Sequence, residues 1–289
     1  MTFGTFIAPD ETLHDVADPA AALGIPMYSG YQTKRLMDEF QGQNRIFDRI
    51  AERVCALSLP YEDQCSPQYY HDIVRTLRDY NGQFDRVVEV GVFMGGATAY
   101  LGGCVEPFDF DLDLVDVSAE YLRFAYERTR RTFPEAARRM RIFHGDVPSY
   151  VRHVMLEERG RRTIVHHDGD HNFTQVVKDL AALSFVRDDL VALIAQDTHL
   201  RGTPEFMNFV DMALYAVFGT DLNYSGIGSA YHGDTQMTQP NCYQGNYFMP
   251  GVVEGVVVPM ATNQFLYPHR LFGPEHFLPP ARGDIAEAA

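Results

Sequence analysis

Short apolar runs alternate with amphipathic segments through the middle of the chain. Five runs have the length and content of buried strands: RVVEVG at 86–91, DLDLVDV at 111–117, RIFHGD at 141–146, RTIVHHD at 162–168 and DLVALIAQD at 189–197. The segments between them predict helices at 97–105, 119–133, 147–159 and 172–184. Strands that alternate with helices in this way form a parallel sheet covered on both faces. We therefore expect an α/β fold with a doubly wound, mostly parallel sheet.

The first 80 residues have a different pattern. Residues 1–30 mix Pro, Gly and small polar residues, which indicates an irregular arm. Apolar residues then recur at helical spacing from Thr33 to Leu57, and a further helix is predicted at 66–80, where Ser66 is the N-cap and Pro67 the first helical residue. We expect residues 1–80 to form an N-terminal helical extension that assembles subunits or acts as a lid, with the arm packed on a neighbour. A homo-oligomer is the expected state.

The chain beyond Arg201 is rich in aromatic residues, glycine and amides, above all at 224–248, and a β-branched run follows at 251–260. Long loops of this kind are usually functional or disordered, and the Tyr and Asn content favours an ordered loop. We expect residues 81–289 to form one domain, with a substrate loop at 201–250 and a closing hairpin of the sheet.

Composition and charge narrow the range of partners. The 289 residues are 46% hydrophobic and 22% charged, as in a soluble globular protein. Lys and Arg total 24 against 39 Asp and Glu, and the net charge of −15 repels a nucleic-acid backbone. The four cysteines form no C-x-x-C pair, and no apolar stretch approaches the ~18 residues of a membrane span. We expect a cytoplasmic protein that binds neither nucleic acid nor membrane.

A glycine turn follows the first of the five predicted strands, in VVEVGVFMGG at 87–96. Gly91 permits a sharp turn, while Gly95 and Gly96 let the backbone approach a ligand and let the next helix pack on its strand. The pattern differs from the G-x-G-x-x-G that binds a dinucleotide pyrophosphate, which disfavours a nicotinamide or flavin cofactor. Taken alone, the turn is equally typical of a purely structural tight turn.

Acidic residues end the next two strands. Asp116 ends the second strand, and Gly145-Asp146 ends the third. In a doubly wound sheet these ends lie beside the glycine turn, where a carboxylate can accept hydrogen bonds from ribose hydroxyls and another polar group can meet an adenine amine. The ordered series therefore predicts an adenosine site.

Three segments resemble the motifs of class I S-adenosylmethionine-dependent methyltransferases, which have a Rossmann-like fold. EVGVFMGG resembles their first motif, LVDVS their second and FHGDV their third. The resemblance covers roughly residues 85–200. It implies S-adenosylmethionine as cofactor, with Glu89 and Gly91 near the methionine part, Asp116 at the ribose and Asp146 at the adenine.

The last two predicted strands also end in carboxylates, in HHDGDHNF at 166–173 and AQDTHLRG at 195–202. Asp168 and Asp197 would end neighbouring strands, so both carboxylates emerge at the same crevice. Two hard oxygen ligands suit Mg²⁺, which takes one or two protein carboxylates and keeps positions for substrate oxygens and water. In an alternative interpretation, Asp168 and Asp170 only cap the helix that begins near Asn172.

The stretch HDGDHNFTQVVKDL resembles the D-G-D-H segment of metal-dependent small-molecule O-methyltransferases, including the macrocin O-methyltransferase group. Together with AQDTHLRGTP it is also similar to the cephalosporin hydroxylase family, whose members carry a Glu-Asp pair before Thr. Here that pair is Gln196-Asp197, and Gln offers a neutral carbonyl oxygen in place of a charge. The resemblance implies Asp168 and Asp197 as metal ligands, with Gln196 as a provisional third.

Four of the eleven histidines gather around these strand ends, namely His166, His167, His171 and His199. His171 is the first candidate for a general base, because it directly follows the strand end and an imidazole titrates near neutral pH. His199 is the second. An iron site with two histidines and one carboxylate, built from His166, Asp168 and His199, is an alternative use of the same residues.

These features predict Mg²⁺-assisted methylation of a hydroxyl on a small molecule. Sugars and catechols both offer a suitable oxygen, and the aromatic, amide-rich residues at 224–248 favour a sugar or a glycosylated natural product. The alternative is a metal-dependent hydroxylase-like or partner-assisting protein of the cephalosporin hydroxylase family, which binds the cofactor without acting as a simple methyltransferase. Fold resemblance does not decide between the two.

Overall fold

One sheet of eight strands forms the centre of the protein. The computed structural model describes residues 2–28, 40–63, 65–203, 205–232, 245–266 and 273–280. The strands of the sheet are β1 (Thr5–Ile7), β2 (Arg86–Val90), β3 (Asp111–Asp116), β4 (Met140–His144), β5 (Thr163–His167), β6 (Leu190–Gln196), β9 (Ser225–Ala230) and β11 (Val253–Pro259). Their order is β1-β4-β3-β2-β5-β6-β11-β9. Strands β4, β3, β2, β5 and β6 are parallel, whereas β1 and β11 are antiparallel to their neighbours.

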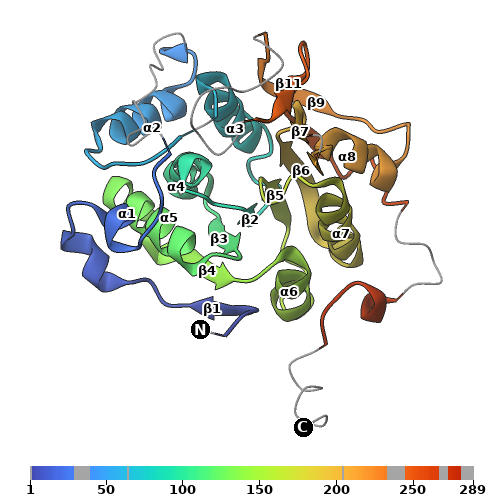
Figure 1. Cartoon of the computed structure of the whole chain (residues 1–289), viewed down its shortest axis with the longest axis horizontal. Coiled ribbons are helices and arrows are strands. Elements are labelled where there is room, and N and C mark those ends of the chain that lie inside the picture. The colour runs from blue at the N-terminus through green and yellow to red at the C-terminus, as the bar shows by residue number, and fades with distance from the viewer. Residues whose placement is uncertain are drawn as a thin grey trace.

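Helices cover both faces of the sheet (Figure 1). On one face lie α2 (Arg45–Ala56), α3 (Pro67–Asp79), α4 (Gly96–Phe108) and α5 (Ala119–Thr132), and on the other lie α6 (Val147–Tyr150), α7 (Phe173–Leu183) and α8 (Val210–Phe218). A separate apolar core fills the space between the sheet and each helical layer. The expected doubly wound, mostly parallel, Rossmann-like sheet with an N-terminal helical extension is confirmed. None of the helices in the described part of the chain has the length and apolar character that a membrane crossing requires.

The five predicted strands all form where they were expected, within two residues at either end. The helix predicted at 147–159 is shorter: α6 ends at Tyr150 and a π-helical turn continues only to Met155. The helical pattern predicted from Thr33 to Leu57 corresponds to α2 in its second half. Residues 33–39 of that pattern lie outside the described residues.

The N-terminal arm packs on its own chain. Its residues Thr5–Ile7 form β1, which pairs with β4 at the edge of the sheet. Further along, the guanidinium of Arg131 on α5 donates to the carbonyl oxygens of Leu13 and Val16. The expectation of an irregular arm was therefore wrong for residues 5–7, where a short strand completes the open edge of β4. It was also wrong for the 3-10 helix Glu11–Asp15 and for α1 (Pro19–Ala22), which begin at the side-chain caps Asp10 and Asp18. Association with a second subunit stays a prediction.

The region expected to be a substrate loop contains regular structure. It holds α8 and a small sheet of β7 (Leu200–Thr203), β8 (Phe206–Met207) and β10 (Tyr247–Phe248) in the order β10-β7-β8. Helix α8 was not predicted because it carries no capping signal: Phe209 occupies the N-cap position and makes no side-chain cap hydrogen bond. About half of the aromatic stretch predicted to line the substrate pocket, residues 233–244, lies outside the described residues.

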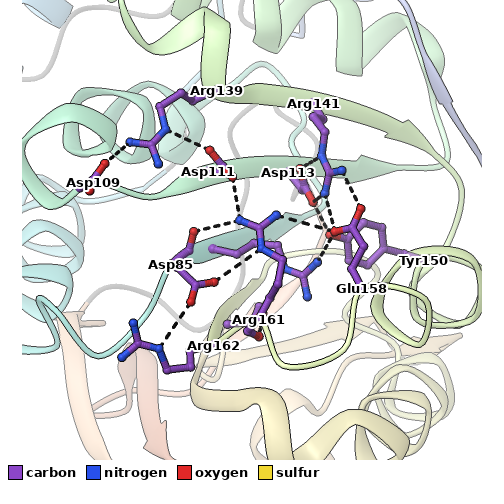
Figure 2. Close-up of polar contacts among 12 residues, drawn as sticks. Asp85, Asp109, Asp111, Asp113, Arg139, Arg141, Tyr150, Glu158, Arg161 and Arg162 are labelled. Carbon is purple, nitrogen blue, oxygen red and sulfur yellow. Dashed lines mark hydrogen bonds and ion pairs between the residues drawn. The ribbon is translucent and has the colours of Figure 1, made fainter.

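A network of ion pairs holds the amino ends of the parallel strands together (Figure 2). Arg139, the residue before β4, pairs with Asp109, which follows α4, and with Asp111 at the start of β3, and Arg161 also contacts Asp111. Deeper in the protein, Arg141 donates two hydrogen bonds of 2.7 Å to Asp113, whose side chain is fully buried. Because a buried carboxylate needs a partner to offset its lost hydration, this pair is the critical member of the network.

We predict that Arg141→Met lowers the free energy of unfolding by about 3 kcal/mol, because it leaves the buried Asp113 carboxylate without its bidentate partner. The control is Arg162→Met, which breaks a 3.4 Å contact with Asp85 between two largely exposed side chains and should cost less than about 1 kcal/mol. Chemical denaturation of both variants measures the difference. Equal, small losses would show that Asp113 does not depend on Arg141.

Candidate functional site

A cavity of about 660 Å³ opens at the carboxyl ends of the parallel strands. Each of the five strands contributes a residue to its wall: Gly91 after β2, Asp116 at the end of β3, Asp146 after β4, Asp168 after β5 and Gln196 at the end of β6. These five residues were singled out from the sequence, and the sheet topology brings them together. The volume lies within the range typical of small-molecule sites.

The glycine turn at the cavity is required by the packing of the backbone. Gly91 has φ +76°, and a Cβ atom at this position would lie 2.1 Å from the carbonyl oxygen of Asp168. Gly95 has φ +71° and packs α4 against Ala125 of α5, away from the cavity wall. Gly96 lines the cavity and has no room for a side chain beside the hydroxyl of Tyr70. The turn therefore serves the fold and also exposes backbone to the cavity.

The Asp116 carboxylate fixes the glycine turn to β3. It accepts hydrogen bonds from the backbone N–H of Val92, at 2.9 Å, and of Ser118, at 2.8 Å. Burial raises the pKa of Asp116 although these hydrogen bonds oppose the shift. Since each carboxylate oxygen has about two acceptor sites, the group retains capacity for a ligand's hydroxyl.

Two further predicted residues lie on the same wall. Glu89, on β2, is 1% exposed, and burial raises its pKa well above the usual value. Asp146 caps α6 by accepting from the N–H of Ser149, at 2.9 Å, and lies 3.7 Å from the ammonium of Lys178. Asp146 therefore has structural contacts in addition to its place at the cavity.

Asp168, His171 and Asp197 form a compact cluster. Each offers a ligand atom, and these atoms all lie within 4.8 Å of one another. The Nε2 atom of His171 is 3.0 Å from Asp197 Oδ2 and 3.5 Å from Asp168 Oδ1. Asp197 adopts a left-handed backbone conformation, with φ +57°. Such a conformation is uncommon outside glycine and concentrates at functional sites.

The two carboxylates set the charge of His171. Burial lowers the pKa of His171, but Asp197 and the contact with Asp168 outweigh burial and raise it to about 9. The pKa of Asp168 is raised to about 6 by burial and by the charge of Asp197, against the effect of His171. The near-neutral imidazole expected from the sequence is therefore an imidazolium in the metal-free protein. His171 needs a nearby positive charge before it can accept a proton at neutral pH.

Two other histidines singled out from the sequence, His199 and His166, are not part of the cluster. His199 packs edge-on against Phe248, with ring centroids 5.0 Å apart, and its Nδ1 is 3.7 Å from Asp197 Oδ1. His166 is fully buried beside the hydroxyl of Tyr69, at 2.9 Å, and burial lowers its pKa to about 3. Within the described residues, metal-capable histidine and acidic side chains converge at Asp168, His171 and Asp197, so the alternative iron site is not assembled.

Gln196 makes a contact that the sequence does not reveal. Its side-chain N–H group donates to the sulfur of Cys65, at 3.1 Å, and its carbonyl oxygen is buried and makes no hydrogen bond. Cys65, Glu62 and Asp63 come from the segment before α3 and line the cavity, as does Asn208 from the region after β7. Motif reasoning missed these four. The signal for Glu62, Asp63 and Cys65 was the general expectation that the N-terminal extension covers the site. Asn208 lies within the predicted substrate loop at 201–250.

No protein-family model and no curated protein sequence matches the chain. Solved structures with a similar fold include the O-methyltransferase TomG from Streptomyces achromogenes in complex with S-adenosylmethionine, at 12% identity over 75% of this chain and 90% of that chain, with a TM-score of 0.44. An S-adenosylmethionine-dependent O-methyltransferase from Thermotoga maritima is 11% identical over 78% of this chain and 74% of that chain, also with a TM-score of 0.44. At these values the likeness carries no inference about activity, and the function is inferred from the site itself.

We predict that His171 keeps its proton at neutral pH in the metal-free protein and titrates with a pKa of about 9. Histidine ring chemical shifts followed by NMR between pH 5 and pH 10 measure this value. The assignment comes from the loss of the resonance in His171→Gln. In Asp197→Asn, which removes the nearest negative charge, the pKa should fall by at least about one unit. Titration of His171 below pH 7 in the wild type would contradict the cluster's electrostatics.

Proposed function

We propose that the protein is an S-adenosylmethionine-dependent, Mg²⁺-assisted O-methyltransferase that acts on a hydroxyl of a small molecule. The observation that carries this proposal is the shared cavity. Asp168 and His171 of the cluster line the same cavity as the glycine turn and Asp116, and Asp197 lies directly behind them in contact with His171. A donor site and a site for removing a proton are thus within reach of one bound acceptor.

The charge of the cavity supports a cationic methyl donor. The described residues of its lining include eight acidic residues and no Lys or Arg: Glu62, Asp63, Glu89, Asp116, Asp146, Asp168, Asp170 and Asp179. A pyrophosphate would be repelled from such a wall, whereas a sulfonium and an ammonium would be attracted to it. S-adenosylmethionine carries both cations, and its ribose offers hydroxyls to Asp116. Asp146 and the adjoining Val147 are the candidates for contact with the adenine.

The cluster fits a hard divalent cation. Asp168 and Asp197 supply carboxylate oxygens, and the buried, unpartnered carbonyl oxygen of Gln196 supplies a third oxygen of the same cavity wall. Oxygen donors of this kind are the ligands that Mg²⁺ prefers. Mg²⁺ held by these residues would supply Lewis-acid chemistry, which would orient an acceptor hydroxyl and lower its pKa.

His171 is the proposed general base. Its Nε2 faces Asp197, which holds the ring in place and stabilises the imidazolium formed when the ring accepts a proton. The two carboxylates that raise its pKa in the metal-free protein are also the proposed metal ligands. Neutralisation of these carboxylates would bring the pKa of His171 back toward the range in which a base works. The chemical task of the chain is then to align hydroxyl, methyl carbon and sulfur, and to take up one proton.

The proposed acceptor is a sugar or a glycosylated natural product. Asn208 and Asn246 line the cavity, and the amide of Asn208 donates to the side-chain oxygen of Asn246 at 3.3 Å. Asn208 lies beside the cluster because its backbone bridges to Asn172, the residue after His171. Amide groups at this end of the cavity suit an acceptor with several hydroxyls better than an apolar ring.

We predict that Asp116→Ala weakens the binding of S-adenosylhomocysteine about tenfold or more, because hydrogen bonds to the ribose are lost. Isothermal titration calorimetry measures the affinity. Asp109→Ala serves as the control, since this carboxylate is exposed at the opposite edge of the sheet. Thermal unfolding of Asp116→Ala checks that the glycine turn remains folded. Unchanged affinity in a folded variant would remove Asp116 from the donor site.

We predict that Asp168→Asn abolishes most of the turnover while retaining affinity for S-adenosylhomocysteine, since the substitution keeps the shape of the side chain and removes its charge. His171→Ala should lower turnover about 10²-fold and flatten the acid limb of the pH–rate profile. Methyl transfer from labelled S-adenosylmethionine to a panel of sugars, glycosides and catechols measures both effects.

The matched control is Asp188→Asn, an exposed carboxylate far from the cavity. Full activity in excess chelator, with both site variants near wild type, would rule out the metal-assisted mechanism. Tight binding of S-adenosylhomocysteine without transfer to any acceptor would instead favour the partner-assisting alternative of the cephalosporin hydroxylase family.

A further inference from the structure

The carbonyl oxygen of Gln196 is an anomaly of the buried site. The residue is 4% exposed, and this oxygen has no hydrogen-bond partner. A buried carbonyl without a partner costs about 1–3 kcal/mol, so its persistence calls for a ligand. The strand register places it beside the cluster: His167 pairs with Ala195, and the next residues on the two strands are Asp168 and Gln196.

The orientation of the Gln196 amide depends on Cys65. With no other constraint, the N–H groups of an amide beside two carboxylates would turn toward the negative charge, and the oxygen would turn away. In the structure an N–H group donates instead to Cys65 Sγ. The sulfur therefore engages one N–H group of the amide, and the carbonyl oxygen of the same amide is left without a partner.

The segment that carries Cys65 is itself fixed to the strand next to Gln196. The backbone N–H of Ser66 donates to the carboxylate of Glu254, at 2.8 Å. Glu254 lies on β11, one residue before Gly255, which pairs directly with Gln196. The hydrogen bond between Ser66 and Glu254 and the pairing of β11 with β6 thus fix the position of Cys65 relative to Gln196. Neither contact involves Asp168, His171 or Asp197.

We propose that Cys65 is a positioning residue that presents the carbonyl oxygen of Gln196 to a divalent cation held by Asp168 and Asp197. This proposal rests on the proposed function, because it concerns the same metal site. Gln196 serves as a neutral oxygen ligand, and two carboxylates balance the charge of the cation. The N-terminal extension then supplies no metal ligand itself. It contributes to the metal site because its Cys65 holds the side chain of Gln196, which is a ligand.

The test is Mn²⁺ binding to the full-length, metal-free protein, measured by the loss of the free-ion EPR signal. Cys65→Ala should weaken Mn²⁺ binding about tenfold, the usual effect of losing an outer-sphere contact. Cys65→Ser, which retains a hydrogen-bond acceptor, should stay within about threefold of wild type. The control is Cys104→Ala, which removes an equally buried thiol from the core around α4, and it should leave Mn²⁺ binding unchanged.

A double-mutant cycle separates positioning from general damage to the site. Gln196→Leu should weaken Mn²⁺ binding as much as Cys65→Ala does, and adding Cys65→Ala to Gln196→Leu should have less than about a twofold further effect. Circular dichroism and the thermal midpoint establish that each variant is folded.

Three outcomes would overturn the proposal. Wild-type Mn²⁺ affinity in folded Cys65→Ala, or equal losses from Cys65→Ala with and without Gln196, would exclude positioning by Cys65 and leave the proposed function intact. Absence of Mn²⁺ binding in the wild type would overturn both the metal-assisted mechanism and this inference. Calorimetry with S-adenosylhomocysteine would then show whether the donor site survives without a metal.

Discussion

The backbone contact between the turn after β2 and the end of β5 is the constraint on which the site depends. The N–H of Asp168 donates to the carbonyl oxygen of Val90 at 2.8 Å. The Asp168 carbonyl lies so close to Gly91 that no other residue, with a Cβ atom, would fit at that position. This contact brings the glycine turn within one strand spacing of the carboxylate cluster. A donor and an acceptor bound at these two places would be neighbours because the two backbones touch.

The electrostatics of the molecule differ sharply between the two edges of the sheet. At the amino edge each charged group described has a partner of opposite sign, as in the pair of Arg141 and Asp113. At the carboxyl edge the cavity wall is acidic, with no Lys or Arg in the part of the chain that the structure describes. Concentrated negative charge destabilises a fold by self-repulsion, and a cationic ligand relieves that repulsion. The acidic wall therefore indicates the charge of what binds there.

The sequence predicted the strands accurately because each is a buried apolar run bounded by polar residues, a pattern that local physics alone enforces. The strand-end residues Asp116, Asp168 and Asp197 followed from the topology, since parallel strands end at one edge. Helix α8 and strand β1 were missed because α8 lacks a cap and β1 is three residues long. The contact between Cys65 and Gln196 spans 131 positions, and no local pattern encodes it. The pKa of His171 likewise depends on the packing of three separate segments.

Strand β1 also covers what would otherwise be an open edge of the sheet. Without it, β4 would be an edge strand whose unpaired N–H and C=O groups could accept a strand from any other chain. The three residues of β1 close this edge while presenting only a short one of their own. The arm thus protects the protein against aggregation by strand pairing. A recombinant form without the arm would expose β4 as an unpaired edge strand, at the opposite edge of the sheet from β9.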